Sequence, residues 1–146
     1  CKDLLLPKNN RSELIEKNEK LIFLDAYNAN PSSMIASLET FKSFLEDNNK
    51  SLEDCLFVLG DMNELGEKSS EYHEQIGEFL KSMGIIHAAF VGRFAKFYNS
   101  GFGGTGKTFA TTESLKDNWQ EHCSACSNIF LKGSRTLQLE SLVALI

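Results

Sequence analysis

The sequence predicts an α/β fold: a Rossmann-like, three-layer domain with a mostly parallel sheet of about six strands and helices on both faces. Short, almost continuous apolar runs, such as CLFVL at residues 55–59 and NIFLK at residues 128–132, are typical of strands buried on both faces. They alternate with amphipathic segments of helical periodicity, which is the order of a parallel sheet with helical crossovers. The length of 146 residues, with 42% hydrophobic residues, suits one ordinary domain.

The first elements are expected to form a hairpin with one antiparallel strand at an edge of the sheet. The apolar run LIFLDA, residues 21–26, follows a polar turn at residues 17–20 and a short segment at residues 12–16. We therefore expect residues 1–20 to be an interdomain linker with an edge strand, and residues 21–146 to be the folded domain. The start CKDLLLPKNN, without Met, suggests a cut through a larger protein.

Helices and strands then alternate along the chain. Residues 31–44 carry apolar side chains at helical spacing, with Asn30 able to cap the helix and Pro31 in a first-turn position that needs no amide hydrogen. Further helices are expected at residues 70–83, 94–99, 111 or 112 to about 123, and 140–146. Further strands are expected at residues 55–59, 86–91, 107–110 and 128–132.

Composition narrows the classes of partner. A net charge of −5 without a basic stripe argues against nucleic acid. The absence of an apolar run near 18 residues and of a signal-peptide pattern argues against a membrane or export, so a cytoplasmic protein is expected. The pair Cys123 and Cys126 closes a helix and lacks the four ligands of a closed zinc site, so we expect no metal there.

The stretch GFGGTGKT, residues 101–108, matches the phosphate-loop pattern G-x-x-x-x-G-K-[ST]. A working phosphate loop follows a strand and opens a helix, so that backbone amides and the helix dipole converge on the phosphates. Here a helical segment precedes the glycines and β-favouring residues follow them. We expect a flexible surface loop, with a small phosphate-loop kinase as an alternative.

Ligands of parallel sheets meet the loops that follow the carboxyl ends of strands. The loop DAYNANPSSM offers Asp25, Asn28 and Asn30 before the unpaired amides of a helix start, which can receive hydroxyls or an anion. A plain capped turn is the alternative. The acidic loop of residues 60–73 is either a solvated turn or a weak cation site.

The loop LKGSRTLQLE, residues 131–140, places Lys132, Ser134 and Arg135 together after the last strand. A lysine and a forked guanidinium suit a carboxylate or a phosphate. An ordinary turn is again the alternative.

Four spaced motifs in order resemble one family over nearly the whole chain: NNRSE, LDAYNANPSSM, LGDMNELGE and LKGSRTLQLE. They are similar to the C-terminal domain of the Mur ligases that add a dipeptide. The resemblance implies an ATP-dependent amide ligase of peptidoglycan synthesis that joins D-alanyl-D-alanine to a UDP-N-acetylmuramoyl tripeptide through an acyl phosphate. The N-terminal domain and the central ATPase domain, which would use ATP and Mg²⁺, are outside this chain, so the chain alone is expected to be inactive.

The resemblance also implies roles for individual residues. The expected nucleotide-binding residues are Arg11, Asp25, Asn28 and Asn30. The expected substrate-binding residues, facing the incoming dipeptide, are Lys132, Ser134 and Arg135. Related ligases that add single amino acids usually place the acid directly before the tyrosine, whereas Ala26 separates the two here. The alternatives are a free-standing α/β ligand-binding module and the equivalent domain of another Mur or folylpolyglutamate synthase type ligase.

Overall fold

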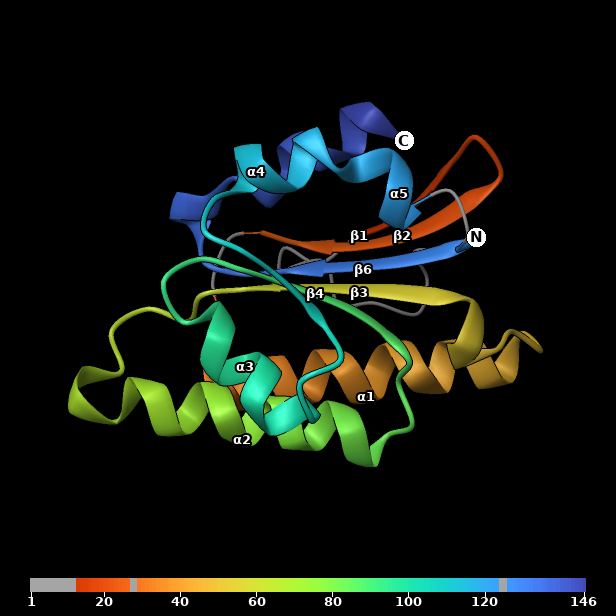
Figure 1. Ribbon diagram of the computed structural model, residues 1–146. Coiled ribbons are helices and arrows are strands. Elements are labelled where there is room, and N and C mark those ends of the chain that lie inside the picture. Colours follow the sequence, from red (N-terminus) through yellow and green to blue (C-terminus); the bar gives the residue numbers. More distant parts are fainter. Residues whose placement is uncertain (1–12, 27–28, 124–125) are drawn as a thin grey trace.

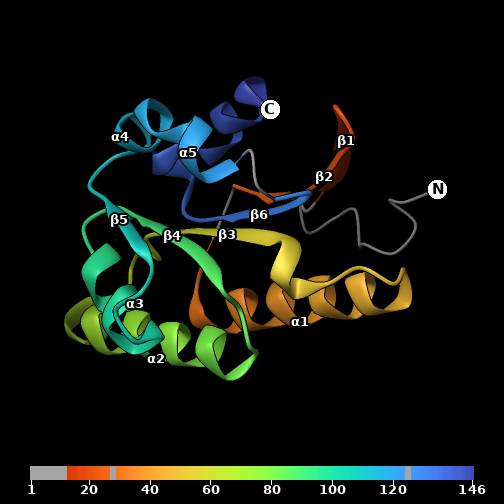
Figure 2. The ribbon, with the colours of Figure 1, turned by 45° about the vertical axis from the view of Figure 1, so that its right-hand side comes forward.

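The computed structural model describes residues 13–26, 29–123 and 126–146. Its centre is a six-stranded sheet in the order β1-β2-β6-β3-β4-β5, with helices above and below it (Figures 1 and 2). The strands are β1 (Glu13–Lys17), β2 (Lys20–Asp25), β3 (Cys55–Gly60), β4 (His87–Val91), β5 (Lys107–Phe109) and β6 (Asn128–Lys132). The predicted three-layer α/β architecture is confirmed.

All neighbouring strands run parallel except β1, which pairs with β2 in the antiparallel direction. The two-residue turn of this hairpin has Asn18 and Glu19 at positive φ values of 51° and 67°, the conformation that a tight turn matched to the sheet twist requires. The expected antiparallel edge strand is therefore present. The last strand, β6, lies between β2 and β3 and so joins the two halves of the sheet.

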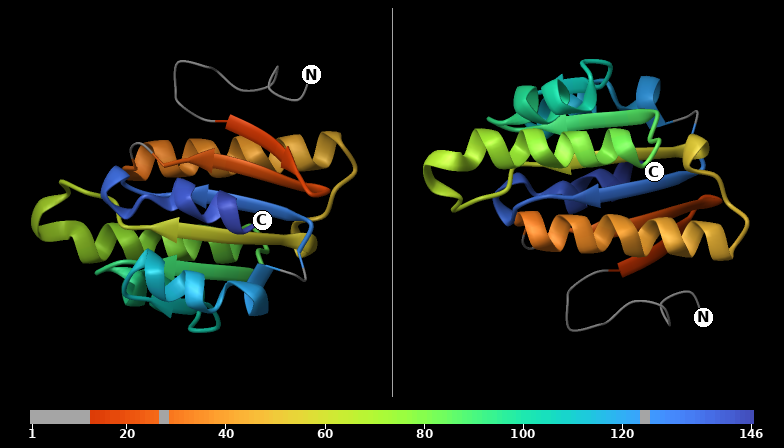
Figure 3. Two further views of the ribbon diagram at one scale, coloured as in Figure 1. Left: turned by 90° about the horizontal axis from the view of Figure 1, so that it is seen from above. Right: turned by 90° about the horizontal axis from the view of Figure 1, so that it is seen from below.

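The helices form two layers. One face is covered by α1 (Pro31–Asp47), α2 (Ser69–Ser82) and α3 (Ala95–Phe102). The other face is covered by α4 (Thr112–Asp117), α5 (Trp119–Cys123) and a 3₁₀ helix (Leu139–Leu145). Figure 3 shows the two layers from above and from below the sheet, with the long helices α1 and α2 running along the direction of the strands.

Helix α1 begins where the sequence predicts. The Asn30 side chain accepts a hydrogen bond from the Ser33 amide at 2.9 Å, and the Asn30 amide donates to Ser33 Oγ at 3.1 Å. This reciprocal capping box, followed by Pro31, satisfies donors that a helix start otherwise leaves unpaired. Met34, Leu38, Phe41, Phe44 and Leu45 then form the buried stripe of the helix.

Two elements differ from the sequence-based expectation. The predicted helix that ends near residue 123 is divided into α4 and α5, because Asn118 turns back and donates from its side-chain amide to the Ser114 carbonyl at 3.0 Å. The predicted last helix is a 3₁₀ helix, which follows Gln138 at a positive φ of 53°.

Each face of the sheet has its own apolar core. On the α1 face, Phe23 and Phe130 stack with ring centroids 4.8 Å apart, and Phe41 packs against both. On the opposite face, Trp119, Leu139 and Leu142 are almost completely buried. Within the described ranges, no helix is both long enough and apolar enough to cross a membrane.

Candidate functional site

The carboxyl ends of the parallel strands lie along one edge of the sheet, at the left of Figure 1. This carboxyl edge carries Asp25 at the end of β2, Lys132 at the end of β6 and Asp61 directly after β3. It is the edge at which α/β sheets bind their ligands. Its geometry follows from the in-register pairing of the strands.

The central feature of the edge is an ion pair between two expected site residues. Asp25 and Lys132 are register partners in the β2–β6 pair, and Lys132 Nζ lies 2.5 Å from Asp25 Oδ2. Their side chains are only 7% and 1% exposed. The Gly133 amide also donates to the Asp25 carbonyl, at 3.3 Å. A buried charge pair of this kind holds two strand ends together, because removing either partner leaves the other charge desolvated.

This pairing links two residues to which the sequence assigns separate roles. Asp25 is expected at the nucleotide and Lys132 at the dipeptide, and both roles stay predictions. The ammonium of Lys132 is already held by a carboxylate, so a substrate carboxylate reaching it would compete with Asp25.

Asn30 caps helix α1, as the alternative interpretation of its loop as a plain capped turn predicts. Its side-chain oxygen is the acceptor for the Ser33 amide, and its role in nucleotide binding stays a prediction. Asn28 and Arg11, the other two expected nucleotide-binding residues, lie outside the described residues.

The loop after β6 is a tight turn. Ser134 is 3% exposed, its amide donates to the Asp61 carbonyl at 3.0 Å, and its Oγ lies 3.1 Å from Thr136 Oγ1. Arg135 begins a short 3₁₀ helix (Arg135–Leu137), and its side chain is exposed. Lys132 ends β6, and Ser134 and Arg135 follow it in the turn; of these three residues, only Arg135 has an exposed side chain.

The tip of β3 meets this turn at a close contact between two glycines. A Cβ on Gly133 would come within 2.9 Å of Gly60 Cα. Such a distance is shorter than carbon atoms tolerate, so a larger residue at position 133 would push β3 and β6 apart, whereas a Cβ on Gly60 would strike the Leu137 side chain. The Gly60 carbonyl also accepts a hydrogen bond from the buried Tyr98 hydroxyl at 2.7 Å.

The role of Asp61 at the carboxyl edge was not predicted from the sequence. The sequence offers its carboxylate as a weak cation ligand, whereas the structure shows it accepting backbone hydrogen bonds from Arg93 at 2.9 Å and Phe94 at 3.0 Å. The signal that could have identified it is positional. An acid that directly follows one strand lies beside the Gly92–Arg93 turn that follows the neighbouring parallel strand.

His73 anchors the loop that leaves β3. Its Nε2 accepts a hydrogen bond from the Met62 amide at 2.9 Å, so the proton of the neutral ring is on Nδ1, which lies 2.6 Å from the Ser69 carbonyl. The ring is completely buried and stacks on Phe94 at 4.5 Å. Burial lowers the pKa of His73, against smaller opposing effects of the Ser69 carbonyl and the Asp61 charge.

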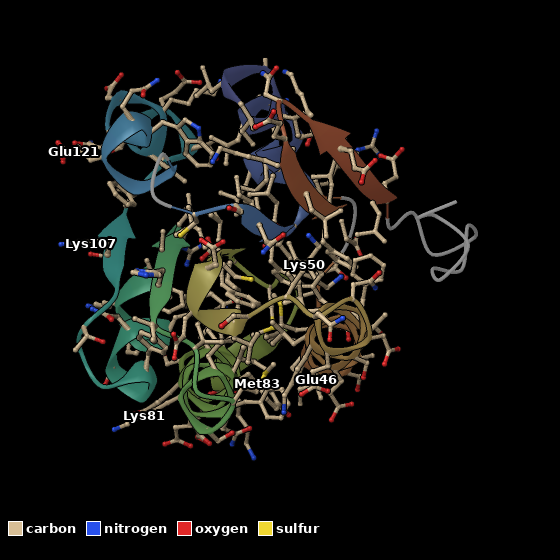
Figure 4. All side chains as sticks on the ribbon, turned by 90° about the vertical axis from the view of Figure 1, so that its right-hand side faces the viewer. Glu46, Lys50, Lys81, Met83, Lys107 and Glu121 are labelled. Atoms are coloured by element: carbon tan, nitrogen blue, oxygen red, sulfur yellow. The ribbon has the colours of Figure 1, made fainter. Side chains whose placement is uncertain are left out.

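The glycine motif lies between a helix and a strand, as the sequence predicts, but it is not a surface loop throughout: Gly101 and buried Phe102 belong to α3, which extends beyond the predicted end at residue 99. Gly101 lies inside α3, where a Cβ would clash with the Glu74 carbonyl of α2, and Gly103 ends α3 with a φ of 102°. Lys107 begins β5 and pairs with Ala89, the middle residue of β4; it is labelled in Figure 4. These glycines therefore serve helix packing and helix termination.

The described residues hold no group of three or more His, Cys, Asp or Glu side chains that could bind a metal. The Asp61 carboxylate is directed at two amides. Among the described residues of this edge, Asp25 pairs with Lys132 and Asp61 with the two amides, so these residues do not fit a Mg²⁺ site by themselves. Of the two cysteines of the C-x-x-C pair, Cys126 is buried. The side chain of Cys123 is not among those that the structure describes, so the expectation of no metal at this pair stays a prediction.

The chain matches the family model described as Mur ligase, glutamate ligase domain, over residues 10–135. Among curated proteins it is 29% identical to the UDP-N-acetylmuramoyl-tripeptide–D-alanyl-D-alanine ligase of Rickettsia prowazekii, over 97% of this chain and 30% of that protein. It is 31% identical to the Bacillus subtilis ligase of the same name, over 91% of this chain and 29% of that protein.

Among solved structures, a crystal structure of MurF from Acinetobacter baumannii has a TM-score of 0.76 and 29% identity, over 95% of this chain and 30% of that chain. The chain thus spans about 30% of the length of the curated relatives it matches. Since the family model covers residues 10–135 of the 146 residues, the chain belongs to the family of Mur ligase glutamate ligase domains.

Proposed function

We propose that this chain is the C-terminal domain of an ATP-dependent ligase that joins D-alanyl-D-alanine to a UDP-N-acetylmuramoyl tripeptide in peptidoglycan synthesis. The observation that supports this most is the similarity to the curated ligases of that name, which extends over 91% to 97% of the chain. The carboxyl edge, with its paired charges, is thereby assigned to the substrate cleft.

In this proposal the chain positions substrates, and the chemistry needs the rest of the ligase. ATP supplies the activation of the tripeptide carboxylate, for which an N-terminal domain and a central ATPase domain are required. Mg²⁺ is assigned to those domains, because the described edge lacks a ligand set for it. Holding two reactants in the correct orientation can lower the activation barrier by about 7 to 11 kcal/mol.

The residue assignments in this proposal are those that the family resemblance implies. The β2–α1 loop, with Asp25, Asn28 and Asn30, is assigned to the nucleotide, together with Arg11. The β6 turn, with Lys132, Ser134 and Arg135, is assigned to the dipeptide. The two loops are neighbours because β2 pairs directly with β6, so nucleotide and dipeptide would meet across one ion pair. The ligase is placed in the cytoplasm.

The test is ligation by the full-length protein that contains this chain. With ATP, the UDP-N-acetylmuramoyl tripeptide and D-alanyl-D-alanine, phosphate release should depend on all three substrates and yield the extended peptide. The chain alone should release no phosphate. If a single amino acid replaced D-alanyl-D-alanine with equal or higher kcat/KM, the ligase would belong to another branch of the family. If the chain alone bound and turned over a ligand, a free-standing module would be the better description.

A further inference from the structure

The turn after β4 holds Arg93 by its backbone. The Arg93 amide donates to Asp61 Oδ2 at 2.9 Å, and the next amide, of Phe94, donates to Asp61 Oδ1 at 3.0 Å. Asp61 is 8% exposed, and each of its carboxylate oxygens accepts one of these two hydrogen bonds. Gly92 has a φ of 120°, and a Cβ there would strike the carboxylate. A glycine is thus required for the carboxylate to approach the turn.

The side chain of Arg93 is oriented by a stack of planar groups. Its guanidinium carbon lies 5.2 Å from the centroid of the Phe94 ring, and that ring stacks on buried His73 at 4.5 Å with an interplanar angle of 21°. Arg93 is exposed. The stack therefore starts at a fixed imidazole in the core and ends at a charged group at the surface, which limits the freedom of the guanidinium.

Asp61 also connects this turn to the β6 turn. Its carbonyl accepts the Ser134 amide at 3.0 Å, while its carboxylate accepts the amides of Arg93 and Phe94. One residue thus sets the spacing between Arg93 and the residue that precedes Arg135. In the sheet order β2-β6-β3-β4, Arg93 lies on the side of β6 that faces away from β2. The strand that precedes Arg93 is two strands from β6, whose turn is assigned to the dipeptide, and three strands from β2, whose loop is assigned to the nucleotide.

We propose that Arg93 binds the terminal carboxylate of the incoming dipeptide, and that Asp61 is the positioning residue that holds Arg93 beside the β6 turn. The proposal rests on the proposed function. A guanidinium matches a carboxylate because its parallel N–H donors pair with both oxygens. The substrate amine would then extend from this anchor toward the ion pair of Asp25 and Lys132.

The test uses the full-length ligase with Arg93→Gln and, as matched control, Lys96→Gln. Lys96 is also exposed and lies 5.2 Å from the ring centroid of the residue after it, Phe97, but it is on α3. Arg93→Gln should raise the KM for D-alanyl-D-alanine about 10-fold or more, the effect of a lost charge-assisted hydrogen bond. The KM for ATP should not change, and Lys96→Gln should leave both values unchanged.

A second substrate identifies the group that Arg93 binds. D-Alanyl-D-alanine amide lacks the terminal carboxylate, so wild type and Arg93→Gln should have equal KM values for it. Arg93→Lys should recover part of the loss with the natural dipeptide. The proposal is overturned if Arg93→Gln matches Lys96→Gln, if its penalty persists with the amide, or if the KM for ATP rises instead.

The positioning role of Asp61 is tested by asking whether the effect of an Asp61 substitution depends on the presence of Arg93. Asp61→Asn should raise the KM for the dipeptide without changing the KM for ATP, and it should add little to Arg93→Gln in the double variant. Full additivity would contradict a positioning role. A wild-type ligase that does not use D-alanyl-D-alanine would refute the proposed function and this assignment with it. An active wild type with an unaffected Arg93→Gln variant would refute this assignment alone.

Discussion

Lys132 Nζ and Asp25 Oδ2 lie 2.5 Å apart at the ends of two neighbouring parallel strands, although the residues are 107 positions apart in the chain. Both side chains are almost completely buried. Removing one member of a buried ion pair is strongly destabilising, because it leaves the other charge desolvated. The pair therefore makes the structure of the edge depend on both residues at once.

Removing the Lys132 charge should destabilise the chain strongly. Lys132→Met removes the ammonium group that pairs with the buried Asp25 carboxylate, and we expect a loss of about 3 to 5 kcal/mol in the free energy of unfolding. The double variant Asp25→Leu/Lys132→Met should recover most of that loss, because neither charge then remains. Urea unfolding measures both variants.

The control for this pair is the exposed ion pair of Lys116 and Glu113, 3.2 Å apart on α4. Lys116→Met should change the free energy of unfolding by no more than about 0.5 kcal/mol, as is usual for surface pairs. Equal effects of the two lysine substitutions would show that the buried pair has no special role.

His73 should make the stability of the fold depend on pH. Burial lowers its pKa in the folded state below the ordinary value of 6.5, so at pH values between the two the unfolded chain binds more protons. The free energy of unfolding should therefore be highest above about pH 6.5 and fall as the pH drops toward the folded pKa. Protonation would also replace the Nε2 acceptor of the Met62 amide by a donor.

The measurement is urea unfolding between pH 5 and pH 8 for wild type, His73→Gln and His87→Gln. His87 begins β4 and is exposed, so His87→Gln should keep the wild-type pH dependence. His73→Gln should lower stability at pH 8 and flatten the curve. An unchanged slope in His73→Gln would assign the pH dependence to other groups.

Local sequence patterns predicted the parallel sheet, the Asn30 cap and the placement of polar residues at strand ends. Those features depend on periodicity and on neighbours within about four residues. The Asp25–Lys132 pair could not be predicted in the same way, because it requires the spatial order that puts β6 beside β2. The contacts of Asp61 with the β4 and β6 turns depend on that order too. The break at Asn118 is a competition between side chain and backbone that periodicity does not detect.

The phosphate-loop pattern gives a prediction about folding. Gly101→Ala would place a Cβ against the Glu74 carbonyl on α2, and we expect a loss of about 1 to 3 kcal/mol in the free energy of unfolding. Ser100→Ala, at the exposed neighbouring position, should have little effect. Lys107→Ala in the full-length ligase should leave the KM for ATP unchanged, since Lys107 begins a strand and not a helix whose first amides could hold a phosphate. A large rise in that KM would restore the phosphate-loop interpretation.

Asn30 combines an observed cap with an expected role at the nucleotide, and two substitutions separate them. Asn30→Ala removes the acceptor for the Ser33 amide and should cost about 1 kcal/mol in the free energy of unfolding. Asn30→Ser restores a capping oxygen but not the amide group. If Asn30 binds the nucleotide, both variants should raise the KM for ATP in the full-length ligase, while only Asn30→Ala loses stability. If Asn30→Ser restores stability and the wild-type KM together, Asn30 acts through the start of α1 and not through contact with the nucleotide.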